Sequence, residues 1–144
     1  MQLTRYTDYS LRVLIFLAIQ PEGRRSTITE IADRFEISRN HLVKIVHRLG
    51  QLGYVTTIRG KGGGLCLGRP AAGINLAEVV RSTESTLDVV DCAEPLCPVA
   101  PACELKRVLN RARDAFLEVL AGFTLADLVA NRDQLGKLLR IEPA

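Results

Sequence analysis

Residues 38–67, SRNHLVKIVHRLGQLGYVTTIRGKGGGLCL, contain the clearest indication of the fold class of this chain. The first half of this stretch has apolar residues at positions 42, 45, 46, 49 and 52, which is the spacing of one buried helix face. Ser38 is a favourable N-cap residue, so we expect a helix from there to about Leu52. Two runs with strand-forming residues, 53–58 and 65–67, lie on either side of a glycine-rich turn and predict a β-hairpin.

A shorter helical pattern precedes this stretch. Thr29 is a candidate N-cap for a helix over residues 30–35, and Ile31, Ala32 and Phe35 form its inward face. Two helices joined by a few residues are the layout of a helix-turn-helix DNA reader, although helical bundles contain the same arrangement. A hairpin directly after the second helix favours the DNA reader, because that is the position of the wing in a winged helix-turn-helix.

The second helix and the hairpin turn have the side chains that a DNA contact needs. Arginine and lysine stand among the glycines of the turn, where the backbone can approach another surface closely. The turn lacks the order of a nucleotide-binding phosphate loop, and a strand follows it where such a loop would open a helix. The predicted contacts are Ser38, Arg39, Asn40, His41 and Lys44 in the major groove, Arg59 and Lys61 in the minor groove, and Arg5 and Arg12 at phosphates or in a supporting role.

The remaining periodic segments are helical. Thr7 is a candidate N-cap for a first helix, and Asn75 for a short helix over residues 75–81. The longest helical pattern spans residues 104–121, and residues 124–127 resemble a capping box. The predicted fold class is mainly α with a small β-hairpin wing. We expect a winged helix-turn-helix over residues 1–70, a connecting helix and cysteine loop over 71–103, and a dimerisation helix with a C-terminal segment over 104–144, all in one compact domain of a dimer.

The net charge of +3 is divided unevenly along the chain. Residues 1–70 have 11 Lys and Arg against 5 Asp and Glu, a net +6, whereas residues 71–144 have 8 against 11, a net −3. This asymmetry fits a basic half that binds a polyanion and a second half with another role, although surface charge also varies by chance. No run of about 18 apolar residues and no recognisable export signal is present, so we expect a cytoplasmic protein without a membrane segment.

The predicted long helix has a wide apolar stripe. Its members are spaced by three and four residues: Leu105, Val108, Leu109, Ala112, Phe116, Val119 and Leu120. A helix of this kind beyond the winged domain needs a partner, and a symmetric copy of the chain would supply one. We therefore expect a homodimer through this helix, and also some packing against the first helix of the same chain.

Three of the four cysteines, Cys92, Cys97 and Cys103, lie in a proline-rich loop. Prolines stiffen an irregular loop, so its sulfurs can face one centre without regular secondary structure. Thiolates are preferred ligands of iron-sulfur clusters and of zinc, and three of them leave one iron of a four-iron cluster open to another ligand. Zinc sites usually have four protein ligands, which this loop does not complete, so a cluster is favoured over zinc and over inert or redox-active thiols. Cys66 is predicted to be a small buried hydrophobic residue.

A catalytic role is not indicated by the sequence. The chain has no C-x2-C redox pair, no recognisable pairing of a nucleophile with a base, and no paired carboxylates in a glycine-framed pocket. We therefore expect a regulator and not an enzyme such as a thiol oxidoreductase. A DNA-binding module that is stabilised by zinc and senses nothing is the remaining alternative.

Four parts of the chain resemble one known family. They are residues 4–14 (TRYTDYSLRVL), residues 31–52, the wing at 59–65 (RGKGGGL) and the three-cysteine loop. Together they are similar to the family of dimeric winged-helix iron-sulfur regulators that contains NsrR and IscR, and the likeness covers nearly the whole chain. In the IscR pattern a histidine ligand follows the third cysteine by three residues, whereas here that position is Lys106. The resemblance is therefore to the NsrR branch, the repressors that detect nitric oxide.

This resemblance implies a mechanism. A homodimeric repressor of nitric-oxide detoxification genes would bind double-stranded operator DNA with an intact cluster and release it when nitric oxide reacts with the iron. Cys92, Cys97 and Cys103 would hold the cluster, 4Fe-4S in preference to 2Fe-2S, and Asp8 from the other subunit would be the fourth ligand. From the residues alone, Asp8 is also explained as a first-turn carboxylate that stabilises its helix. An iron-sulfur or redox-responsive regulator of another signal is the alternative.

Overall fold

The computed structural model describes residues 1–142 of the chain. In this range the elements follow in the order α1 (Arg5–Ala18), α2 (Ile28–Phe35), α3 (Arg39–Gln51), β1 (Val55–Ile58), β2 (Gly64–Leu67), α4 (Leu76–Thr83), α5 (Glu104–Ala121), α6 (Leu125–Leu128) and α7 (Arg132–Leu138). Short 3-10 turns, Ala71–Gly73 and Ala100–Ala102, lie before α4 and α5. The predicted fold class, mainly helical with one β-hairpin, is confirmed.

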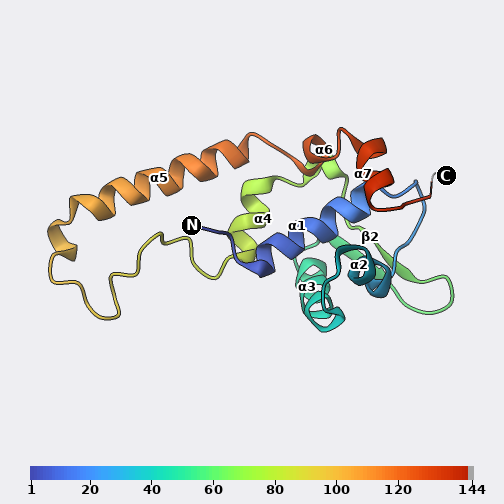
Figure 1. Ribbon diagram of the computed structural model, residues 1–144, viewed down its shortest axis with the longest axis horizontal. Coiled ribbons are helices and arrows are strands. Elements are labelled where there is room, and N and C mark those ends of the chain that lie inside the picture. The colour runs from blue at the N-terminus through green and yellow to red at the C-terminus, as the bar shows by residue number, and fades with distance from the viewer. Residues whose placement is uncertain (143–144) are drawn as a thin grey trace.

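The N-terminal half packs around α1, which contacts α3, α4 and β2 (Figure 1). Leu14 and Phe16 of α1 are fully buried, together with Ile31 of α2 and Leu42 and Leu49 of α3. Full burial of each such side chain stabilises the fold by about 1.5–3 kcal/mol. This core fixes the rotation of α3 about its axis and thereby decides which of its residues face solvent.

The first helix begins one turn earlier than predicted. Its N-cap is Thr4, whose hydroxyl oxygen accepts a hydrogen bond from the Thr7 amide at 3.4 Å. Thr7, the predicted cap, is completely buried inside the first turn and contacts Thr83 of α4. The prediction is wrong because both threonines suit a cap, and a contact far along the chain chooses between them.

The predicted N-cap of the second helix is also wrong. Thr27 and not Thr29 is its N-cap, since the Thr27 hydroxyl oxygen accepts from the Glu30 amide at 3.1 Å. The Thr29 hydroxyl oxygen instead accepts from Nε of Arg39, the first residue of α3, at 3.3 Å. The two helices of the helix-turn-helix are thus joined by a side-chain contact as well as by their connecting turn.

The hairpin is anchored to the core at its second strand. β1 and β2 are antiparallel, with Val55 opposite Leu67. Leu65 is buried, and its backbone exchanges two hydrogen bonds with Ser26, at 3.0 and 2.7 Å. The segment before α2 therefore pairs with the outer edge of the hairpin.

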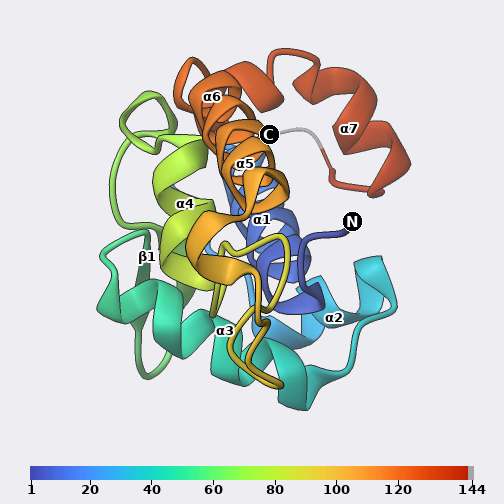
Figure 2. The ribbon, with the colours of Figure 1, turned by 90° about the vertical axis from the view of Figure 1, so that its left-hand side faces the viewer.

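The second half begins with α4 and the long excursion that follows it. The Asn75 cap is confirmed, because its side chain accepts from the Ala77 amide at 3.0 Å. The chain then runs away from the compact half through the cysteine loop and returns along α5, as Figure 1 shows. α5 has the predicted bounds, 104–121, but its main neighbour within the chain is α4 and not the first helix. In Figure 2, which looks nearly along α5, α4 lies beside it.

The apolar stripe of α5 is largely uncovered within the chain. Leu117, outside the predicted stripe, is the residue of α5 that is buried. Leu105, Val108 and Val119 are 62, 56 and 64% exposed. Packing inside the described chain therefore does not account for these apolar side chains.

No helix between residues 1 and 142 combines the length and the apolar composition that crossing a bilayer requires.

Candidate DNA interface and cysteine loop

α3 presents one polar face to solvent. Its other face is buried through Leu42, Ile45 and Leu49. The residues predicted to contact the major groove all lie exposed at the start of the helix: Ser38, Arg39, Asn40, His41 and Lys44. Figures 1 and 2 place α3 at one edge of the molecule, with α6 and α7 at the opposite edge. The structure thus brings these five side chains together on one accessible surface.

Neighbouring residues orient two of these side chains and leave Ser38 free of a capping contact. Ser38 is at the N-cap position, but its hydroxyl makes no capping hydrogen bond and is available to an outside partner. Arg39 is held by Thr29 of α2. The His41 ring lies against Tyr9 of α1, with 6.4 Å between the ring centres. His41 therefore also joins α3 to α1.

Four further residues of α3 are exposed; the sequence predicts three of them on its outward face, of which His47 is a plausible DNA reader, and makes no prediction for Val43. They are Val43, His47, Arg48 and Gln51. Val43 is 40% exposed although it is apolar. The helical periodicity that identifies the core also identifies these positions, so the sequence contained the signal.

The wing presents its two predicted cations at the turn between β1 and β2. Arg59 and Lys61 are both exposed there. Two arginines that sequence reasoning missed hold the hairpin in place. Arg25 donates from Nη1 to the Gly62 carbonyl oxygen at 2.7 Å, and Arg69 donates from Nη2 to the Leu52 carbonyl oxygen at 3.0 Å. The partners are 37 and 17 residues apart, and no local pattern reveals such pairs.

Asp8 and Arg12 pair with each other on α1. Nε of Arg12 donates to Oδ1 of Asp8 at 3.0 Å and Nη2 to Oδ2 at 2.9 Å, with both side chains a little over 40% exposed. The Arg12 guanidinium also lies within 6 Å of the ring centres of Tyr9 and Phe35. This position suits the supporting role predicted for Arg12. Arg5 is exposed at the start of the same helix.

The three loop cysteines are free and half-buried. The Cys97 amide donates to the Cys92 carbonyl oxygen at 3.1 Å, which closes a turn between the first two. Cys103 is the N-cap of α5, and its sulfur accepts from the Lys106 amide at 3.4 Å. Cys66 is half-buried on β2, so the prediction of a fully buried residue is wrong there.

The donor chemistry of the loop suits iron-sulfur or zinc binding, because three free thiols lie in one short segment. Their positions are not yet those of a closed site. Among residues 1–142, no three His, Cys, Asp or Glu side chains are gathered as closely as one metal ion requires. Binding would therefore need the loop to close around the metal.

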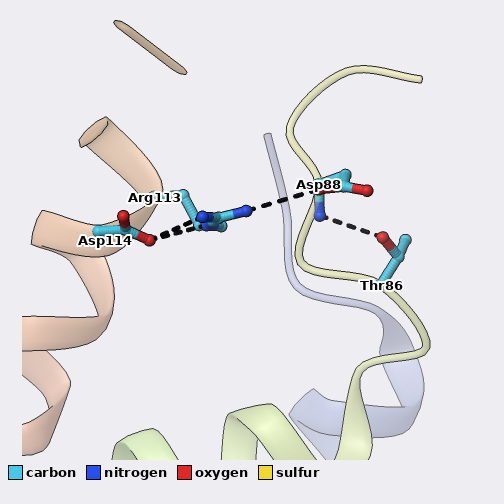
Figure 3. A network of polar contacts seen from close by, with 4 residues as sticks. All are labelled: Thr86, Asp88, Arg113 and Asp114. Carbon is cyan, nitrogen blue, oxygen red and sulfur yellow. Dashed lines mark hydrogen bonds and ion pairs between the residues drawn. The ribbon is translucent and has the colours of Figure 1, made fainter. Parts of the chain in front are cut away.

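Arg113 ties the segment before the cysteines to α5 (Figure 3). It donates to the carboxylates of Asp114 at 2.9 Å and of Asp88 at 3.5 Å. The Asp88 amide in turn donates to the Thr86 hydroxyl oxygen at 3.1 Å. One end of the cysteine segment is thus anchored by an ion pair, and the other by the start of α5.

A sequence model of the family Rrf2, described as "Iron-dependent Transcriptional regulator", matches residues 3–131. The chain belongs to the Rrf2 family. The winged helix-turn-helix built from α2, α3 and the hairpin is accordingly the fold of a transcriptional regulator. The relatives are regulators and not enzymes, in line with the absence of a catalytic motif from the sequence.

Individual Rrf2 proteins agree with this assignment. The chain is 53% identical over 145 residues to the HTH-type transcriptional regulator NsrR of Bacillus subtilis (strain 168), with 99% of each chain covered. The structure of CymR (YrzC), the global cysteine regulator of B. subtilis, has a TM-score of 0.72 and 28% identity and covers 91% of this chain and 98% of that chain. IscR of T. potens shares the fold, with a TM-score of 0.74 and 23% identity over 91% of this chain and 88% of that chain. The resemblance to the family that contains NsrR and IscR is confirmed.

Proposed function

We propose that this Rrf2 protein is a cytoplasmic, homodimeric repressor that releases operator DNA when nitric oxide reacts with an iron-sulfur cluster in its cysteine loop. The similarity to NsrR over 99% of the chain supports the choice of signal. The observation that carries the proposal is the position of Cys103, a free thiol that is also the N-cap of α5. A group bound to this thiol would be attached at the start of α5, the helix with the exposed apolar face.

The DNA contact follows from the exposed surface of α3 and the wing. In a dimer whose two α3 helices lie one DNA turn apart, roughly 34 Å, both helices enter successive major grooves on one side of the duplex. Ser38, Arg39, Asn40, His41 and Lys44 then face base edges and phosphates. Arg59 and Lys61 reach the minor groove, and Arg5 contacts a phosphate. We assign residues 1–70 to this task.

The cluster site uses the thiolates of Cys92, Cys97 and Cys103, with 4Fe-4S as the proposed type and Asp8 of the partner subunit as the fourth ligand. When bound, such a cluster supplies irons that react with nitric oxide. The Asp8 carboxylate is engaged by Arg12 through both oxygens. Ligation would require this carboxylate to exchange the Arg12 guanidinium for an iron of the cluster.

The connecting helix and cysteine loop, over residues 71–103, contact the DNA-binding half through Glu84. Glu84, which ends α4, accepts hydrogen bonds from the Thr4 amide at 2.8 Å and the Thr4 hydroxyl at 2.9 Å, at the start of α1. α1 packs in turn against α3. A closed loop favours one arrangement of these helices, and an open loop removes that bias, which is a two-state switch.

The first experiment is the metal, sulfide and visible absorption of anaerobically purified protein. We expect iron and sulfide in the wild type and in Cys66→Ala, and their loss in Cys92→Ala, Cys97→Ala and Cys103→Ala, because two thiolates cannot replace the third donor. Asp8→Ala should retain an intermediate amount of iron. Stoichiometric zinc without sulfide in the wild type would support a zinc-stabilised module and contradict the proposal.

A further inference from the structure

The segment before α2 lies along the wing at two points. Ser26 pairs with Leu65, near the start of β2, through two backbone hydrogen bonds. Arg25, the residue before, extends further along the hairpin, and its Nη1 donates to the Gly62 carbonyl oxygen at 2.7 Å. Gly62 belongs to the turn that presents Arg59 and Lys61. A side chain from outside the hairpin thus binds the part of the wing that faces outward.

The turn has little internal support. Each strand of the hairpin is four residues long, and a two-stranded hairpin is only marginally stable by itself. Gly60 and Gly62 have φ values of +91° and +76°, which glycine adopts without a steric penalty. Glycine also loses more backbone entropy than any other residue when it becomes ordered. One backbone hydrogen bond, from the Gly63 amide to the Gly60 carbonyl oxygen at 2.9 Å, closes the turn. The Arg25 bond therefore restrains a segment that its own sequence leaves free to move.

We propose that Arg25 is a positioning residue for DNA binding, which acts through the wing and does not itself contact DNA. Its hydrogen bond orders the turn before DNA arrives, so less conformational entropy is lost when Arg59 and Lys61 engage a phosphate or a groove. This inference rests on the proposed role of the wing. From its charge alone, Arg25 would be interpreted as a residue that contacts a phosphate. The inference assigns it a role inside the protein.

Arg24 provides a matched control. It is next to Arg25, has the same charge, and donates from Nη2 to the Glu30 carboxylate at 2.7 Å, away from the wing. Replacing either arginine by alanine changes the net charge equally. Only Arg25→Ala removes a contact to the turn.

The experiment measures binding to a labelled mixed-sequence duplex of about 30 base pairs at several salt concentrations, by fluorescence anisotropy. We expect Arg25→Ala to weaken binding by about threefold to tenfold with an unchanged slope of log K against log salt, and Arg24→Ala to stay within about twofold of the wild type. The double variant Arg59→Ala with Lys61→Ala should lower the slope by about two. In that background Arg25→Ala should have no further effect, because its path to DNA has been removed.

Amide hydrogen exchange in the free protein tests the same inference without DNA. The Gly63 amide should exchange faster in Arg25→Ala than in Arg24→Ala. Equal exchange in the two variants would overturn the inference. So would an Arg25→Ala effect that persists in the absence of Arg59 and Lys61, since Arg25 would then contact DNA directly. If the double variant binds as the wild type does, the wing is outside the interface, and the proposed role of the wing fails together with the inference.

Discussion

At the scale of single residues, two buried hydroxyls join the first helix to the fourth. Oγ1 of Thr7 and Oγ1 of Thr83 are 2.9 Å apart, across 76 residues of sequence. The Thr83 hydroxyl donates to the Val79 carbonyl oxygen at 2.8 Å. Each hydroxyl has one hydrogen, so Thr7 is the donor in the pair. The Thr7 hydroxyl therefore depends on Thr83 for its hydrogen-bond acceptor, whereas the Thr83 hydroxyl has its own acceptor in Val79.

Replacing Thr83 by valine should lower the free energy of unfolding by about 1–3 kcal/mol, because the buried Thr7 hydroxyl loses its acceptor. Thr7→Val with Thr83→Val should lower it by clearly less than the sum of the single changes, since neither hydroxyl is then left unpaired. Urea unfolding of the wild type and the three variants measures both quantities. A Thr7→Val loss as large as that of Thr83→Val would contradict the assigned direction of the hydrogen bond, and additive losses would contradict the pairing itself.

At the start of α6, the Asp127 side chain makes a capping contact with Thr124. The Asp127 carboxylate accepts from the Thr124 amide at 2.7 Å and from its hydroxyl at 3.0 Å, and these bonds hold the pKa of Asp127 below its ordinary value. At pH values above the ordinary pKa of an aspartate, the lowered pKa of Asp127 stabilises the fold. This contribution is lost as the pH falls through the lowered pKa. An NMR titration should give a low pKa that rises part of the way back in Thr124→Ala, which keeps the amide bond. A wild-type pKa at or above about 3.9 would contradict this assignment.

At the scale of elements, α5 is the helix whose sequence and packing disagree most. Its apolar stripe is as regular as that of a buried helix, yet Leu105, Val108 and Val119 remain mostly in solvent within one chain. Burial of each such side chain against a second copy would contribute about 1.5–3 kcal/mol before the cost of association. This arrangement favours a dimer built on α5.

Val108→Glu should shift the dimer toward monomer, because a carboxylate would be buried in an apolar contact. Val108 is more than half exposed in the single chain, so the substitution should leave the helical circular dichroism unchanged. Arg111→Gln is the control, since it changes the net charge by the same amount at another exposed position of α5. Sedimentation of both variants at micromolar concentration provides the measurement. A wild-type protein that sediments as a monomer would remove the basis of this prediction.

The elements also show what the sequence could predict. Residues 104–121 and the Asn75 cap were predictable, because a long periodic run and a single capping candidate leave little choice. The caps of α1 and α2 were not, since each segment contains two suitable threonines and the burial of Thr7 against α4 decides the first. The exposed face of α3 follows from periodicity. The contact of Arg25 with the wing does not, because it joins segments that share no local pattern.

At the scale of the whole molecule, the division of charge matches the division of structure. The basic residues 1–70 form α1, α2, α3 and the hairpin, whereas the net-negative remainder contains the cysteine loop and α5. Figure 1 shows the cysteine loop and α5 extending away from the compact half that contains α1, α2, α3 and the hairpin. In the proposed function, the first part binds DNA of any sequence and the second part receives the signal.

In the proposed function, the state of the cysteine loop controls the affinity for a preferred DNA sequence. The most direct test is one anaerobic titration, in which nitric oxide is added to the protein bound to a duplex that it has itself selected from a random pool. Visible absorption and fluorescence anisotropy are recorded together. We predict that the absorption of thiolate-bound iron disappears while the affinity for the selected duplex falls by at least about tenfold, and that weak binding to an unrelated duplex is unchanged. Loss of the absorption with no change in affinity for the selected duplex would contradict the claim, because the cluster would then be only structural.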